Sequence, residues 1–264
     1  MTGRKSPNSS RTTCCRQSSC DRDVWTGWRL MDEITRIRQE YASRTERLKG
    51  SDLYSLFSVA QLFTIQQRQR NLVKYLRKHG LYPLSDRAIL EVGCGQGRVL
   101  LEHLSLDASP RLLHGSDLLF DRLQHARQTL PNLPLTNADA QNLPYASGSF
   151  DLVMQLTVFS SILDENVREK LAREMARVVK PGGVILSYDF WINPVNPQTQ
   201  GITPAEIKRL FPGCRYEFHR ITLAPPIARR LVPISWGMCM FLESLGTFNT
   251  HYLTMIWPSD TIIE

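Results

Sequence analysis

The 264-residue sequence lacks several signatures that would exclude or assign whole classes of protein. It contains no C-x-x-C pair and no cysteine–histidine spacing typical of a zinc site, so we expect free thiols and no metal. It has no run of 18 or more apolar residues, which argues against a membrane-spanning helix. We therefore expect a cytoplasmic protein without stable membrane insertion.

The sequence also has little excess charge once the position of that charge is considered. The formal net charge is +7, but residues 1–30 hold six basic and two acidic side chains and account for +4 of it. The mild remainder does not suggest a nucleic-acid footprint, and we expect no nucleic-acid partner. Hydrophobic content of 42% and charged content of 22% are ordinary for a globular protein.

The first thirty residues differ in composition from the rest. They are rich in serine, threonine and arginine and have no apolar core, so they do not form a secretory signal, and we expect a disordered tail. Met31 begins "MDEITRIRQEYASR", a good helical start, so residues 1–30 would lie upstream of the true initiator. A transit peptide is the alternative.

Hydrophobic periodicity predicts an alternation of strands and helices, which indicates a parallel sheet covered on both faces. N-terminal helices are expected from residue 32 to about 49 and from the aromatic-rich segment 54–63 to a stop at Gly80 and Pro83. The expected strands are 87–92, 111–116, 133–137, 150–156, 183–189, 215–223 and 250–257. The expected helices that follow are 97–105, 119–130, 165–179, 204–210 and one around 227–245.

A glycine-rich turn follows the first core strand in "ILEVGCGQGRVL", residues 89–100. A dinucleotide-binding turn would carry its third glycine at position 98, where this chain has Arg98. Asp117 ends "LLHGSD", twenty residues after Gly97, where a carboxylate can accept hydrogen bonds from both hydroxyls of a ribose. Its alternative role is the N-cap of the next helix.

Four segments in this order resemble the class I S-adenosylmethionine-dependent methyltransferases, and most closely their type 11 small-molecule subfamily, which includes ubiquinone and menaquinone methyltransferases. They are "ILEVGCGQG", "GSD", "NADAQNLPYASGSFDLV" and "LAREMARVVKPGGVILSYDF", between about residues 86 and 190. The resemblance implies an α/β, Rossmann-like sheet of seven mostly parallel strands with an antiparallel last strand and helices on both faces. It also implies S-adenosylmethionine as cofactor, a helical lid at 31–84, and a core at 85–264 with a helical insert at 225–246.

The resemblance further implies which residues bind the cofactor. The glycine loop would surround its methionine and ribose part, Asp117 would bind the ribose hydroxyls, and Leu118 would pack on the adenine. Asp139 would accept from the adenine amino group, Ala140 would offer its backbone amide, and Gln155 would lie near the methionine. The expected cofactor-binding residues are thus Glu91, Gly93, Gly95, Gly97, Asp117, Leu118, Asp139, Ala140 and Gln155. "RVVKPGG", residues 177–183, would be a structural turn before the fifth strand.

No catalytic residue is assigned by these motifs. The position after the fourth strand reads "MQLTVFSSI" instead of an Asn-Pro-Pro-Tyr-like motif, which disfavours methylation of adenine amino groups. Ser160 or Ser161 stands where the family often has histidine. Asp189 and Tyr188, at the carboxyl end of the fifth strand, are candidate bases, with a loop cap and a packed wall residue as their alternatives.

The acceptor site is expected outside these motifs. Candidates are Tyr54, Phe57 and Arg68 in the N-terminal helices, and Trp236 in segment 225–246, which would be a lid for a hydrophobic acceptor or an interfacial helix. Ordinary packing on the sheet is the alternative for each. The resulting hypothesis is methylation of a small molecule, at a hydroxyl oxygen of a specialised metabolite, quinone precursor or sugar. Carbon methylation of a quinone or lipid-like acceptor and non-catalytic cofactor binding are alternatives; the oligomeric state stays open.

Overall fold

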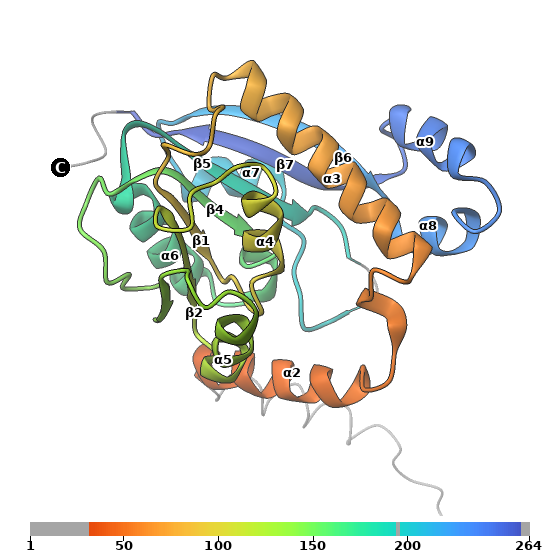
Figure 1. The fold of residues 1–264 in the computed structure, drawn as a ribbon, viewed down its shortest axis with the longest axis horizontal. Coiled ribbons are helices and arrows are strands. Elements are labelled where there is room, and N and C mark those ends of the chain that lie inside the picture. Colours follow the sequence, from red (N-terminus) through yellow and green to blue (C-terminus); the bar gives the residue numbers. More distant parts are fainter. Residues whose placement is uncertain (1–31, 194–195, 260–264) are drawn as a thin grey trace, which may run out of the picture.

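The structure, a computed structural model, describes residues 32–193 and 196–259, so the expectations for residues 1–30 lie outside the described residues. Figure 1 shows a twisted sheet flanked by helices. Its seven strands have the order β3-β2-β1-β4-β5-β7-β6. Strands β1 to β5 pair in parallel, whereas β7 runs antiparallel to both β5 and β6. The predicted fold class is confirmed.

The strands follow the predicted segments closely. The central ones are buried on both faces, as expected of parallel strands covered by helices. Their bounds are β1 Ile89–Val92, β2 Leu113–Asp117, β3 Leu135–Asn137, β4 Phe150–Leu156, β5 Val179–Phe190, β6 Arg215–Leu223 and β7 Asn249–Trp257. Because β1 and β4 lie side by side in the middle of the sheet, their carboxyl ends meet where ligands of open α/β sheets bind.

Some of the helices begin at a side chain that caps them. Asp164 accepts hydrogen bonds from the backbone N–H groups of Asn166 and Val167, and Thr203 accepts one from Glu206. The bounds are α2 Glu33–Arg47, α3 Val59–Lys78, α4 Arg98–Leu104, α5 Phe120–Thr129, α6 Glu165–Val178, α7 Pro204–Leu210, α8 Pro225–Leu231 and α9 Trp236–Ser244, with short 3₁₀ turns at Asp52–Tyr54 and Phe159–Ser161. No helix within the described ranges is long and apolar enough to cross a bilayer.

Two apolar clusters fill the space between the helices and the two faces of the sheet. Helices α3, α4 and α5 pack on one face through residues such as Leu76, Leu100 and Leu123. Helices α6 and α7 pack on the other, with Leu171 and Ile207 fully or almost fully buried. A third cluster joins the start of α3 to α8 and α9. Helix α2 contributes only Ile37, at the edge of the second cluster.

Two sequence predictions need correction. The single helix expected around 227–245 is two helices, α8 and α9, separated at residues 232–235. Pro233 has no backbone N–H to continue the first helix, and Ser235 caps the second by accepting from Met238 N–H. Strand β5 begins at Val179 rather than at residue 183. The "KPGG" turn is therefore a bulge inside β5, where Gly182 adopts φ +73° and the pairing with β4 shifts.

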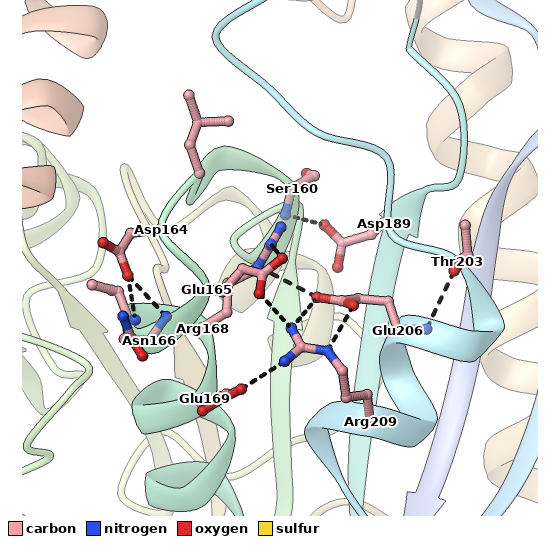
Figure 2. A network of polar contacts seen from close by, with 12 residues as sticks. Ser160, Asp164, Glu165, Asn166, Arg168, Glu169, Asp189, Thr203, Glu206 and Arg209 are labelled. Atoms are coloured by element: carbon pink, nitrogen blue, oxygen red, sulfur yellow. Dashed lines mark hydrogen bonds and ion pairs between the residues drawn. The ribbon is translucent and has the colours of Figure 1, made fainter. Parts of the chain in front are cut away.

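An ion cluster with a fully buried arginine at its centre joins α6 to α7 (Figure 2). The guanidinium of Arg168 is completely buried and lies 3.5 Å from a carboxylate oxygen of Glu206 and 3.8 Å from one of Glu165. Arg209 bridges the same Glu206 at 2.9 Å and also reaches Glu169 at 2.6 Å. None of the three side-chain nitrogens of Arg168 has a hydrogen-bond partner among the described residues. Two helices are thus held together around a charge that is expensive to bury.

Candidate functional site

The site is built on the turn between β1 and α4. Gly93, Gly95 and Gly97 all adopt left-handed backbone conformations, with φ of 72°, 55° and 78°. Lack of space adds to this at Gly93, where a Cβ atom would collide with the side chain of Val158. At Gly95 a Cβ atom would meet only the far end of the flexible Arg122 side chain, so the backbone conformation is what favours glycine there. The glycines leave the backbone of the turn open to a close ligand.

Asp117 ties this turn to the end of β2. Its carboxylate accepts hydrogen bonds from Gly95 N–H at 2.7 Å and from Leu119 N–H at 2.8 Å. Burial raises the pKa of this carboxyl above its ordinary value, and these two bonds and the charge of Arg122 oppose the rise. The N-cap-like bond to Leu119 and the bond to the glycine turn occur together, so Asp117 fixes the shape of the site before any ligand arrives.

A cavity of about 150 Å³ opens beside this turn. Five of the predicted cofactor-binding residues line it: Gly93, Asp117, Leu118, Asp139 and Ala140. The other four, Glu91, Gly95, Gly97 and Gln155, do not line it. The carboxylate of Asp139 accepts hydrogen bonds from the backbone and side-chain nitrogens of Gln141 at 2.9 and 3.0 Å. Residues far apart in sequence thus gather around one volume at the carboxyl edge of the sheet.

Sequence reasoning missed several residues of this cavity. Ile34, Ile37 and Tyr41 of α2 form one wall, and Arg122 of α5 forms another, with its guanidinium 4.7 Å from the ring centroid of Tyr41. The helical spacing of the three α2 residues was visible in the sequence. That spacing alone does not indicate which part of the molecule the helix covers.

Glu91 is a buried acidic group in the centre of the sheet. Its side chain is buried, and Oε2 has no hydrogen-bond partner among the described residues. Burial raises its pKa well above the ordinary value, partly offset by the charge of Arg68. Arg68 is itself paired with Glu102 at 2.5 Å. Burial favours the neutral form of this group, and a cationic or ammonium group of a ligand placed nearby would favour its ionised form.

Gln155 links the ends of β4 and β5. Its side-chain amide donates to Asp189 Oδ2 at 2.5 Å and to Ser187 Oγ at 2.6 Å, and its oxygen accepts from Val158 N–H at 2.8 Å. Val158 lines the cavity, so Gln155 positions part of the cavity wall. Its predicted place near the methionine of a cofactor stays a prediction.

The two candidate bases are both buried. Asp189 also accepts from Ser160 N–H at 3.0 Å, and burial raises its pKa from 3.8 to about 6 (Figure 2). Tyr188 shares a hydrogen bond with Thr222 at 2.9 Å and stacks on His251, and burial raises its pKa above 10.0. Neither side chain lines the cavity. Their assignment as bases stays a prediction.

The raised pKa of Asp189 predicts a pH dependence of stability. Native Asp189 binds its proton more tightly than the unfolded chain does, so its contribution to stability is greatest below pH 3.8 and is lost as pH rises to about 6. This loss is about 3 kcal/mol, at about 1.4 kcal/mol per pKa unit. As the pH rises from 4 to 7, the free energy of unfolding of an Asp189→Asn variant should therefore increase relative to that of the wild type. Urea unfolding of both proteins at both pH values checks this. The same difference in free energy of unfolding at pH 4 and at pH 7 would contradict it.

The four candidate acceptor residues have different surroundings. Tyr54 accepts a hydrogen bond from Arg44 at 2.9 Å and is 37% exposed, whereas Phe57 is 94% exposed. Arg68 lines a second, smaller cavity between α3 and the sheet, 5.6 Å from the ring centroid of Tyr188. Trp236 packs edge-on against Phe63 at 4.9 Å. None of the four lines the larger cavity, and their predicted role in acceptor binding stays a prediction.

Comparisons with known proteins agree with this geometry. Residues 89–183 match a family model described as a methyltransferase domain. The chain is 30% identical, over 118 residues, to the ubiquinone/menaquinone biosynthesis C-methyltransferase UbiE of Campylobacter jejuni, a match that covers 43% of this chain and 49% of that protein. It is 28% identical, over 175 residues, to the fatty-acid O-methyltransferase of Mycolicibacterium smegmatis, covering 61% of this chain and 62% of that protein.

A solved structure extends the likeness to most of the chain. Phosphoethanolamine N-methyltransferase 1 of Haemonchus contortus, in complex with phosphoethanolamine and S-adenosylhomocysteine, is similar over 87% of this chain and 51% of that one. The TM-score is 0.58 at 14% identity, which shows a shared fold. The chain spans less than two thirds of the length of the curated relatives that it matches.

Proposed function

We propose, from the premise that residues 89–183 form a class I S-adenosylmethionine-dependent methyltransferase domain, that the protein methylates a small molecule. The observation that carries the proposal is the gathering of Gly93, Asp117, Asp139 and Ala140 around one cavity at the carboxyl edge of the sheet. The expected cofactor has a ribose diol, an adenine and a charged amino acid. Carboxylates and a backbone amide around this cavity would suit the ribose diol and the adenine, which is what a nucleoside site requires.

The proposed contacts follow the chemistry of each group. Asp117 is proposed to accept from the two ribose hydroxyls, and Leu118 to pack on the adenine. Asp139 would accept from the adenine amino group, and the backbone amide of Ala140 would donate to the ring. Glu91 would lie on the side of the amino acid, where its unpartnered oxygen suits an ammonium group. The open backbone of the glycine turn, Gly93 to Gly97, lets the ligand approach closely.

The bound cofactor would supply a methyl group already activated by its sulfonium. What remains for the protein is alignment of the acceptor, and positioning of two reactants contributes about 7–11 kcal/mol to lowering a barrier. We propose that α2 closes the site, because Ile34, Ile37 and Tyr41 form an apolar wall of the cavity. This wall would also exclude water from the reacting atoms.

We propose a hydroxyl oxygen as the methylated atom. Removal of its proton needs an acceptor group near the reacting atoms, and Asp189 is better suited than Tyr188 because its pKa of about 6 leaves it ionised at neutral pH. The curated relatives support either atom, since one is named an O-methyltransferase and another a C-methyltransferase. Carbon methylation of a quinone or lipid-like ring is therefore the second candidate. Cofactor binding without catalysis is the third.

The proposal is tested first by calorimetric titration of S-adenosylhomocysteine and, in parallel, of NADH. We expect binding of the first and no heat with the second, because the turn lacks the third glycine of a dinucleotide site. Binding of NADH alone would contradict the proposal. Transfer of labelled methyl from S-adenosylmethionine to a panel of alcohols, sugars and quinones then distinguishes oxygen from carbon methylation.

A further inference from the structure

Helix α9 is apolar on both of its faces. The inner face is packed against α3 and α8 through the fully buried Cys239 and through Trp236, which contacts Phe63. The outer face carries Met238, Phe241 and Leu245, at the i, i+3, i+7 spacing of one helical stripe, and these are 53%, 60% and 52% exposed. A helix packed on a protein core normally turns a polar face to water. The outer face of α9 lacks one.

Further exposed apolar side chains lie at the same end of the molecule. Ile234, in the turn that leads into α9, is 79% exposed. Leu56 and Phe57, just before α3, are 60% and 94% exposed. The start of α3 packs beside α8 in the same apolar cluster, and α8 and α9 project together from that end (Figure 1). We call the exposed side chains of Ile234, Met238, Phe241 and Leu245 the α9 surface. These side chains lie together on one helix and the turn before it, whereas exposed apolar side chains in a water-soluble protein are usually scattered.

Within segment 225–248 the charged side chains without an ion-pair partner among the described residues have one sign. Glu243 is the only acidic residue between positions 225 and 248, and it is paired with Arg70 at 3.1 Å. Arg229 and Arg230, in the last turn of α8, are exposed and form no ion pair within the described residues. Within segment 225–248 the apolar stripe is therefore accompanied by two cationic side chains without an ion pair and by no unpaired carboxylate.

We propose that the α9 surface docks reversibly on an anionic lipid bilayer. Apolar side chains would enter the boundary between headgroups and acyl chains, while Arg229 and Arg230 bind lipid phosphates. The helix has nine residues, so it would lie in the interface rather than cross it. A second copy of the chain is a poorer occupant. A two-fold interface on this surface would place the same cationic side chains near one another without a carboxylate to pair with them.

The experiment is sedimentation of the full chain with lipid vesicles. We expect binding to vesicles containing phosphatidylglycerol, weaker binding to phosphatidylcholine alone, and weakening of the former by salt. An Ile234→Ser/Phe241→Ser variant should bind about tenfold more weakly or worse, because two apolar side chains no longer enter the lipid. An Arg229→Gln/Arg230→Gln variant should lose the preference for anionic vesicles. Leu101→Ser on α4, which is 48% exposed away from this surface, is the matched control and should bind normally.

Three outcomes would overturn the proposal. The first is absence of wild-type binding to anionic vesicles at low salt. The second is equal binding by the wild type and the Ile234→Ser/Phe241→Ser variant. The third is self-association of the wild type, measured by light scattering, that this variant abolishes, because the surface would then be a protein interface. Thermal unfolding of each variant, followed by circular dichroism, shows whether the fold is intact. The vesicle result does not depend on the proposed function.

Discussion

An Asp117→Ala variant should bind S-adenosylhomocysteine about 100-fold more weakly than the wild type, if it binds at all. Two charge-assisted hydrogen bonds to a ribose would be lost, and each contributes about 1.5–3 kcal/mol. The variant also releases Gly95 N–H and Leu119 N–H, which the carboxylate holds at 2.7 and 2.8 Å. The glycine turn would then have to become ordered on binding. Titration calorimetry measures the change.

Asp121→Ala is the matched control for this experiment. Asp121 lies in the first turn of α5 and is exposed, so it shares the charge of Asp117 without its contacts. We expect the control to bind like the wild type. Thermal unfolding of both variants separates loss of the ligand from loss of the fold. If Asp117→Ala folded normally and bound with unchanged affinity, the assignment of the ribose site would be wrong.

The second large effect is expected at Arg168. Replacing this fully buried side chain with alanine leaves a cavity and removes one cation from Glu206, which should cost about 3–5 kcal/mol of the free energy of unfolding. For a domain of this size the melting temperature should fall by about 10 °C. Thermal unfolding followed by circular dichroism measures it.

An Arg168→Met variant separates the two contributions. Methionine keeps much of the buried volume but carries no charge, and the nitrogens of Arg168 have no hydrogen-bond partner among the described residues. Replacing a poorly satisfied buried charge with an apolar side chain is often neutral. We therefore expect a clearly smaller loss than with alanine. Arg209→Ala, at the exposed end of the same cluster, should also have a small effect. Equal losses in all three variants would show that volume and burial do not govern this cluster.

The parts of the site that were predicted from sequence are those fixed by local chemistry. A turn with positive φ at three positions favours glycine at each, so Gly93, Gly95 and Gly97 can be recognised from residue type alone. Asp117 follows a short buried strand, and a carboxylate at the end of such a strand must lie at the carboxyl edge of the sheet. The position of Asp117 at the end of its strand was therefore enough to predict where in the sheet it lies.

The parts that were not predicted depend on contacts between distant segments. Ile34 and Tyr41 have helical spacing, but only the path of residues 48–58 decides where α2 lies. The partners of Gln155 come from the neighbouring strand β5, and neither segment alone shows which strands pair. An interruption at Pro233 could be inferred from its missing backbone N–H, but its division of the segment into two separate helices, α8 and α9, was not predicted.

The order of the strands has a consequence for synthesis on the ribosome. Strand β7 is made after β6 yet lies between β5 and β6 in the sheet. While residues 249–257 are still inside the ribosome, the outer edge of β5 from Ile185 to Phe190 has no partner, and β6 has none at all. Unpaired strand edges are the parts of a growing chain most prone to aggregate. The nascent protein should therefore depend on chaperones until β7 emerges and pairs with β5 and β6.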